Sequence, residues 1–272
     1  MWTDDGEPEV PLPGGDVTEG VVRVGGTVRR PVQENSPLVH ALLKHLESVG
    51  FDGAPRFLGI DARAREVLTF IEGEVAGRPR PAWIADESRL VSVARLVRAY
   101  DDAAVTFTPP PGTDDAPGSR TQPSGTHSSD APPGIPPAPP YPPELTGHVD
   151  ITPENVVFRD GEAVALIDFD LAKPATRADE VFNMMMWWAP LADPADVDPL
   201  LQQVDVPRRC RLLADAYGMS QVDRERLVNV AIMRTRRSWH LMKRHAETRG
   251  GGWQRMWDEG VGDVINRRLA WL

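Results

Sequence analysis

The sequence predicts an α+β chain, folded as one large domain or two small lobes, in which short β-prone runs with one helix precede a larger, mostly helical part. Residues 21–71 consist of short β-prone runs separated by glycine and charged turns. Residues 86–104 and 206–272 instead repeat apolar side chains at helical spacing. Between these helical stretches, two apolar runs flank Asp160-Gly161, a residue pair typical of a tight β-hairpin. A hairpin is therefore expected inside the helical lobe.

Composition limits the classes of function. The 272 residues carry 40 Asp and Glu against 30 Lys and Arg, a formal net charge of −10 that disfavours binding to nucleic-acid polymers. A single cysteine, Cys210, excludes an intrachain disulfide and favours the cytoplasm. Residues 1–5 lack the apolar run of a signal peptide, and no run of about 18 apolar residues predicts a membrane span. The oligomeric state is left open.

The first lobe opens with a glycine-rich stretch, residues 14–20, which contains Gly15 and Gly20. Two β-prone runs follow at residues 21–24 and 27–30, joined by a Gly-Gly pair that predicts a tight hairpin. Glycine-rich stretches often do no more than form turns, so this one is weak evidence of function when taken alone.

Two arginines end the second of these runs. Alternation along a strand places Val28 and Arg30 on one face and Arg29 on the other. Arginine can bind a phosphate through two parallel hydrogen bonds, so both arginines are candidate phosphate ligands. The alternative is that both are solvated charges on an edge strand.

The rest of the first lobe predicts one helix and two strands. Serine caps helices and proline fits their first turn, so Ser36-Pro37 marks a helix start. Residues 56–60 and 66–71 are further β-prone runs that would complete a five-stranded antiparallel sheet. One apolar face of the helix is formed by Val39, Leu42, Leu43 and Leu46.

The second lobe contains a segment of unusual composition. Residues 108–143 are rich in Pro, Gly, Ser and Thr and have few large apolar side chains. Such a segment buries too little surface to offset the entropy of ordering it, so we expect a disordered surface insertion. Further on, Asp179-Glu180 predicts a helix start, and the Met/Trp run at residues 184–188 is expected in the core.

Two polar clusters flank the expected hairpin. The first is His148-x-Asp150 with Asn155 five residues later, and the second is Asp168-Phe169-Asp170. The hairpin folds the chain back, so Asn155 and Asp168 are expected to lie close together and to offer hard oxygen ligands to Mg²⁺. Asp150 can then accept the proton of an attacking hydroxyl. The alternative is a hairpin with two buried polar turns.

These two motifs resemble the catalytic core of the aminoglycoside phosphotransferase and choline kinase-like family, a branch of the protein-kinase-like fold. The resemblance implies a bilobal, ATP- or GTP-dependent O-phosphotransferase that needs Mg²⁺. It implies that Asp150 is the catalytic base and that His148 supports its loop. The implied metal ligands are Asn155, Asp168 and, with less support, Asp170.

The resemblance also divides the chain. Residues 1–73 become the nucleotide-binding lobe and residues 74–272 the catalytic and acceptor-binding lobe, interrupted at about 108–143. Gly15 and Gly20 then belong to a loop that covers the nucleotide, and backbone groups at Phe70 and Ile71 form a hinge that binds the base. Arg30, and next Arg29, takes the place of the family's phosphate-binding lysine.

One departure concerns the first helix, where the family carries a glutamate that orients the phosphate-binding cation. His40 stands at about that position and cannot neutralise an arginine, so we expect it to be an ordinary solvated residue. With lysine and glutamate both replaced, a second hypothesis is a catalytically weak, nucleotide-binding pseudokinase that acts as an immunity or partner-binding module.

The acceptor is open at this point. Residues 221–272, expected to help form the acceptor pocket, carry 11 Arg and Lys against 6 Asp and Glu. A basic segment attracts polycations poorly. The sequence therefore predicts a small-molecule hydroxyl acceptor without a choice between an aminoglycoside, a sugar, an amino alcohol or another metabolite.

Overall fold

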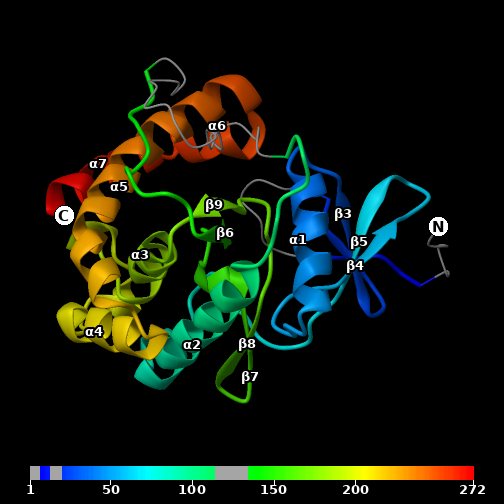
Figure 1. The fold of residues 1–272 in the computed structure, drawn as a ribbon, viewed down its shortest axis with the longest axis horizontal. Coiled ribbons are helices and arrows are strands. Elements are labelled where there is room, and N and C mark those ends of the chain that lie inside the picture. The colour runs from blue at the N-terminus through cyan, green and yellow to red at the C-terminus, as the bar shows by residue number, and fades with distance from the viewer. Residues whose placement is uncertain (1–6, 13–19, 114–133) are drawn as a thin grey trace.

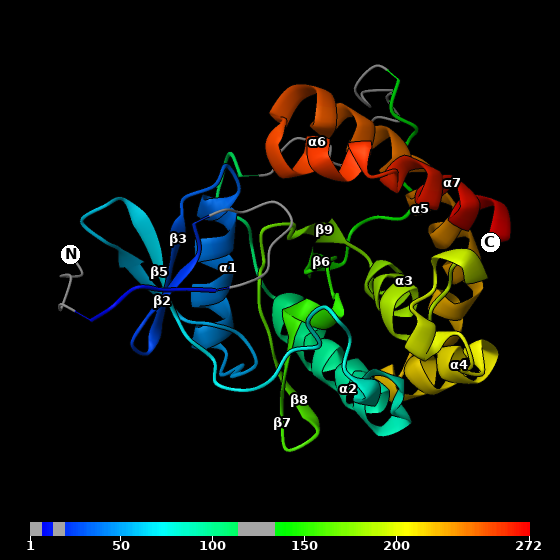
Figure 2. The same cartoon turned by 180° about the vertical axis from the view of Figure 1, so that it is seen from behind.

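The structure, a computed structural model, describes residues 7–12, 20–113 and 134–272. It confirms the predicted bilobal α+β architecture: a small sheet with one helix occupies one end, and a larger helical lobe occupies the other (Figures 1 and 2). Gly15 and its neighbours lie outside the described residues. No described helix is both long enough and apolar enough to cross a bilayer.

The first lobe is a five-stranded antiparallel sheet with the strand order β1-β2-β3-β5-β4. The register of β3 against β5 places Val28 opposite Leu68 and Arg30 opposite Glu66. Cross-strand neighbours are close enough for their side chains to interact directly. The strands are β1 (Val10–Pro11), β2 (Val22–Val24), β3 (Thr27–Pro31), β4 (Phe57–Ile60) and β5 (Arg65–Thr69).

Helix α1 (Ser36–Ser48) begins at the predicted Ser-Pro pair, with proline in its first turn. Its four predicted apolar residues are all buried. They pack in the common core rather than facing solvent, because the sheet alone has too little apolar surface to cover them.

The second lobe surrounds two short β-ladders with helices. The predicted hairpin is β7 (Val156–Arg159) with β8 (Glu162–Leu166), and both turn residues, Asp160 and Gly161, have positive φ as a type I′ turn requires. Strand β6 (Leu145–Gly147) pairs with β9 (Lys173–Ala175). The helices are α2 (Glu87–Ala104), α3 (Arg177–Trp188), α4 (Val206–Tyr217), α5 (Gln221–Arg249), α6 (Gly251–Asp258) and α7 (Val261–Trp271).

The Pro-rich segment is described only at its two ends. Ile135 is 7% exposed, and Arg237 of α5 donates a hydrogen bond of 2.5 Å to the carbonyl of Pro136. Asn229, also on α5, donates to the hydroxyl of Tyr141 at 3.0 Å. Residues 134–143 thus make hydrogen bonds to α5 that local composition does not show, and disorder of the insertion stays a prediction.

The two lobes are joined by a connection that is fixed to the hairpin. Glu74 and Phe158 exchange backbone hydrogen bonds of 2.9 and 2.7 Å. Gly73 has φ +154°, and a Cβ on it would lie 2.5 Å from the carbonyl oxygen of Phe158 and from Val157 Cγ1. Only glycine fits this position without displacing the hairpin.

We therefore expect Gly73→Ala to lower the free energy of unfolding by about 2–3 kcal/mol, because the added methyl group meets backbone that cannot yield. Gly77→Ala, four residues further on, is the matched control, since a Cβ there has no heavy atom within 4 Å. Urea unfolding of both variants measures the difference. Equal stability of the two variants would contradict a fixed connection.

Candidate active site

The first polar cluster forms a loop in which Asp150 and Asn155 touch. The amide nitrogen of Asn155 donates to Asp150 Oδ2 at 3.0 Å and to the Asp150 carbonyl at 2.9 Å. Because its NH₂ group is committed to Asp150, Asn155 is left with its amide oxygen as the atom that can ligate a cation.

His148 connects this loop to the second cluster. It is fully buried, its Nε2 donates to the carbonyl of Ile167 at 3.0 Å, and its Nδ1 accepts from the backbone N–H of Asp150 at 3.3 Å. Burial lowers the pKa of His148 to about 4, so the ring is neutral at pH 7. Its ring packs against Phe169 at 4.6 Å between centroids. The contacts fit the supporting role predicted for His148.

Asn155 and Asp168 lie at the same end of the hairpin. Ile167 donates its N–H to the Asn155 carbonyl at 2.9 Å, and Val156 pairs with Leu166. Asp168 has φ +63°, an unusual conformation for a residue other than glycine that turns the chain at the end of β8. The hairpin thus gathers the two predicted metal ligands as expected.

The donor set limits how a cation could be held. Within the described part of the chain, no three His, Cys, Asp or Glu side chains form a metal-binding group. An amide oxygen and a carboxylate are hard donors that suit Mg²⁺, which commonly takes only one or two protein ligands and completes its shell with water and substrate phosphates. Asn155 and Asp168 fit that pattern.

Arg30 crosses from the first lobe to this site. Its guanidinium pairs with Glu66 Oε2 at 2.8 Å, with Asp168 Oδ1 at 3.1 Å and with Asp170, and the residue is only 5% exposed. Burial acts against the cation, but Asp170, Asp168 and Glu66 outweigh it and raise the pKa of Arg30. Asp170 is itself buried, and this raises its pKa despite the arginine. Arg30 neutralises the acidic side of the site.

Arg29 points elsewhere. Its guanidinium donates to the Thr27 hydroxyl at 2.7 Å and lies 3.8 Å from Asp61 at the far end of the sheet. The alternation of side chains along β3 separates the two arginines as predicted. Of the two, Arg30 is therefore the one placed beside Asp168.

Glu66 is a site residue that the sequence reasoning missed. It is fully buried and accepts hydrogen bonds from Arg30, from the Ser36 hydroxyl and from His40 Nε2, the last at 3.0 Å. Burial opposes its ionisation, but His40, Arg30 and Ser36 outweigh burial and lower the pKa of Glu66 to about 2. A strand glutamate thus supplies the negative charge expected from the helix.

The expectation that His40 is solvated is wrong. Its ring stacks on Phe57 with centroids 3.7 Å apart, and its Nε2 contacts Glu66. The one sequence signal that could have found this arrangement is the strand pairing that sets Arg30 opposite Glu66, which requires the register of β3 and β5.

Helix α3 contacts the loop of residues 148–151 through side chains that the sequence analysis did not select as site residues. Val149 has φ +53°, and its N–H donates to Glu180 Oε1 at 2.9 Å. Asn183 donates to the Val149 carbonyl at 2.7 Å and accepts from the Ile151 N–H at 2.6 Å. Trp188 Nε1 donates to the Ile151 carbonyl at 2.9 Å. These contacts stabilise the strained loop conformation.

The remaining predicted residues are placed at the lobe junction. Gly20 has φ +80° and lies next to Pro31. Phe70 donates its N–H to Gly26 at 2.9 Å, and the Arg23 guanidinium lies 3.8 Å from its ring centroid. Within the described residues the backbone of Ile71 makes no hydrogen bond to other backbone groups.

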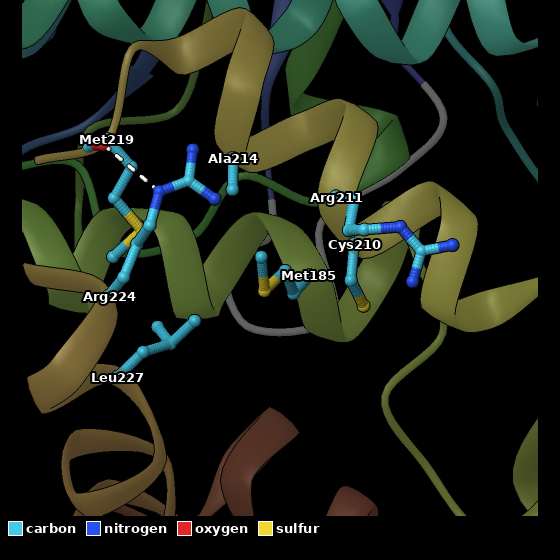
Figure 3. A pocket seen from close by; sticks show the side chains of 7 residues that line it. All are labelled: Met185, Cys210, Arg211, Ala214, Met219, Arg224 and Leu227. Carbon is cyan, nitrogen blue, oxygen red and sulfur yellow. Dashed lines mark hydrogen bonds between the residues drawn. The ribbon is translucent and has the colours of Figure 1, made fainter. Parts of the chain in front are cut away.

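A separate hollow of about 210 Å³ lies between α3, α4 and α5 (Figure 3). None of the predicted site residues lines it. Burial raises the pKa of the Cys210 thiol to about 11, so Cys210 is neither a thiolate nor a nucleophile at pH 7. Its lining residues are Met185, Cys210, Arg211, Ala214, Met219, Arg224 and Leu227.

The family is decided by comparison with known proteins. The model of the phosphotransferase enzyme family (APH) matches residues 21–213. The chain belongs to this family. The chain is also 34% identical over 235 residues to a trifolitoxin immunity protein of Rhizobium leguminosarum bv. trifolii, covering 82% of this chain and 79% of that protein.

Solved structures of phosphotransferases share the fold. A Plasmodium vivax ethanolamine kinase matches with a TM-score of 0.58 at 13% identity, covering 98% of this chain and 81% of that one. A choline/ethanolamine kinase family protein from Mesorhizobium loti gives 0.53 at 14%, covering 97% and 92%. The streptomycin–ATP complex of APH(2″)-IIa gives 0.53 at 11%, covering 84% of each chain. The protein-kinase-like fold implied by the motifs is thereby confirmed.

Removing the charge of Glu66 should disturb Arg30. We expect Glu66→Gln to lower the free energy of unfolding at pH 7 by about 2–4 kcal/mol, because a buried cation loses a partner. The nucleotide dissociation constant should rise about tenfold as Arg30 moves. The matched control is Asp61→Asn, whose carboxylate lies near Arg29 and should leave nucleotide affinity unchanged. Calorimetry measures both affinities, and an equal effect of both variants would count against the assignment of Arg30.

Glu180 should impose a pH dependence on stability. Burial raises its pKa from the usual 4.5 to about 7, so the unfolded chain ionises this group at lower pH than the folded chain does. The contribution of Glu180 to the free energy of unfolding therefore falls by about 3 kcal/mol as the pH rises from 4.5 to 7. Glu180→Gln removes this effect and keeps an oxygen acceptor for the Val149 N–H.

We therefore expect the unfolding free energy of the wild type, minus that of Glu180→Gln, to fall by about 3 kcal/mol between pH 4.5 and pH 7. Urea titration at several pH values measures both free energies. The opposite contribution of His148, whose folded pKa is lowered, is common to both proteins and cancels in the difference. A difference that does not change with pH would refute the assignment.

Proposed function

We propose that this protein transfers the γ-phosphoryl group of ATP or GTP to a hydroxyl group of a small molecule. The observation that carries the proposal is the convergence of Asp150, Asn155 and Asp168 at one end of the hairpin, with Arg30 beside them. Family membership supports the reaction class. The single cysteine and the nucleotide donor favour the cytoplasm as the place of reaction.

In this proposal Asp150 positions the acceptor hydroxyl and accepts its proton, with its carboxylate oriented by the Asn155 amide. Asn155 and Asp168 would hold Mg²⁺, which neutralises charge on the phosphates when it is bound. Asp170, two residues after Asp168, also pairs with Arg30, and we assign it a place near the metal rather than the role of main ligand.

The nucleotide would lie between the lobes that the sequence divides at residue 73. Arg30 would exchange its contact with Asp168 for a donor phosphate, which its fork of N–H groups suits. Glu66 keeps the guanidinium in place during this exchange. Ile71 offers backbone groups to the base, while Gly20 and the unplaced Gly15 belong to the covering loop.

A second candidate function is toxin immunity, favoured by the relative named a trifolitoxin immunity protein. Immunity could arise in two ways: by phosphorylation of a hydroxyl on the toxin, or by binding without catalysis as a pseudokinase. The first is compatible with the intact Asp150, Asn155 and Asp168, and we favour it for that reason. The second would leave these side chains without a task.

The test is Mg²⁺-dependent nucleotide consumption against a library of hydroxylated compounds. Asp150→Asn should lower kcat by about 10²–10⁴ while nucleotide affinity is kept, because only proton acceptance is removed. Asp168→Asn should lower turnover and weaken Mg²⁺-dependent nucleotide binding. Asp160→Asn is the control, since asparagine tolerates the positive φ of this turn position. Equal turnover in all four proteins would reject the proposed reaction, and nucleotide binding without transfer would favour the non-catalytic module.

A further inference from the structure

Lys173 lies beside the loop of His148 and Asp150 and has no side-chain partner among the described residues. In the β6–β9 ladder it pairs with Gly147, the residue just before His148 and three before Asp150. Its ammonium group makes no hydrogen bond or ion pair with any residue in the described ranges. Lys173 is half-buried, and a partly desolvated cation without a counter-charge favours a ligand that supplies one.

The side chains around Lys173 leave it in positive surroundings. Arg234 and Arg237 of α5 lie close enough to lower its pKa, together with burial, to about 8. Figures 1 and 2 show β9 below the arm formed by α5 and α6. His245, also on α5, has a buried Nδ1 without a partner, and burial lowers its pKa to about 4, so it stays neutral.

The two carboxyl groups near Lys173 do not neutralise this charge. Asp179 is engaged by Arg234, which lies 3.5 Å from its carboxylate, and by the Thr176 cap of α3. Glu180 accepts the Val149 N–H, and burial raises its pKa, which favours the neutral carboxyl group over the carboxylate.

Arg237 is the second cation without a carboxylate. It donates one N–H to the Pro136 carbonyl, and no acidic side chain pairs with it in the described part of the chain. A guanidinium has five N–H donors, so most of its capacity is left for a ligand.

We propose that Lys173 and Arg237 bind an anionic group, a carboxylate or a phosphate monoester, on the molecule whose hydroxyl receives the phosphoryl group. This rests on the proposed phosphotransferase function and names its acceptor class: a hydroxylated anion rather than a polycation. The anion lies next to β9, and the hydroxyl reaches Asp150 across the β6–β9 ladder.

The experiment compares matched probes in phosphate-free buffer: D-gluconate with D-glucose, glycerol 3-phosphate with glycerol, and kanamycin as the polycation. Calorimetry measures binding, and Mg²⁺-dependent ADP release, with ATP or GTP supplied in parallel and GDP counted together with ADP, measures transfer. At least one anionic probe should bind about tenfold more tightly than its neutral partner, and kanamycin should bind more weakly than either. Gluconate and glycerol 3-phosphate distinguish carboxylate from phosphate as the preferred anion.

In the wild type, the anionic probe should bind about tenfold more tightly than its neutral partner, and Lys173→Gln and Arg237→Gln should each remove most of this difference. Lys243→Gln, at an exposed position of α5, should not change it. Thermal unfolding and nucleotide affinity show whether each variant is folded. Equal binding of anionic and neutral probes, preferred binding of kanamycin, or an unchanged preference in Lys173→Gln would overturn the proposal.

The outcomes separate this proposal from the proposed function. ADP release with glucose, glycerol or kanamycin but with neither anion would refute the anionic acceptor and leave phosphotransfer standing. Binding of an anionic probe that is lost in Lys173→Gln, with no ADP release for any probe, would support the anion site and refute phosphotransfer.

Discussion

The site depends on one buried cation shared between the two lobes. The Arg30 guanidinium binds Glu66 in its own sheet and Asp168 and Asp170 in the other lobe. A buried guanidinium is stable only when its donors are satisfied, so the lobes cannot separate here without exposing an unpaired charge. Asn35 at the start of α1 reinforces the contact by donating to the carbonyls of Asp170 and Ala172, at 3.0 Å each.

An arginine at this position explains why the supporting glutamate lies on a strand. In an arginine side chain, Nε lies one bond nearer the backbone than the carbon that carries the two terminal nitrogens. A partner on the neighbouring strand can therefore bind Nε while the terminal nitrogens contact the other lobe. The register of β3 against β5 places Glu66 opposite Arg30 for this contact. A lysine has its donors on one atom and would need a partner nearer the cleft. His40 then becomes a ligand of Glu66 instead of a substitute for it.

The sequence was sufficient for features that local patterns encode. The hairpin, the apolar face of α1 and the spacing of Asp150, Asn155 and Asp168 are all short-range, and the structure brings these three residues to one end of the hairpin. Glu66 could not be found in this way, because its role comes from a pairing between residues 36 positions apart.

Helix α3 shows the same limit. Its polar residues Glu180 and Asn183 stand among apolar neighbours at one-turn spacing, a pattern that predicts one face of a helix but not what that face contacts. Only the fold reveals that they bind the backbone of a loop some thirty residues earlier. The Pro-rich segment shows a related limit: composition describes a segment by itself and does not show that Ile135 is buried.

The acceptor has to be argued from local charges, because the family match does not extend to the residues that surround it. The matched region ends at residue 213, whereas Arg234, Arg237 and His245 all belong to α5. The family match therefore supports the reaction class without identifying the acceptor. What α5 adds next to β9 is positive charge that the surrounding carboxyl groups leave uncompensated. A polycation would have to enter against that charge, whereas an anion would supply the partner that Lys173 lacks.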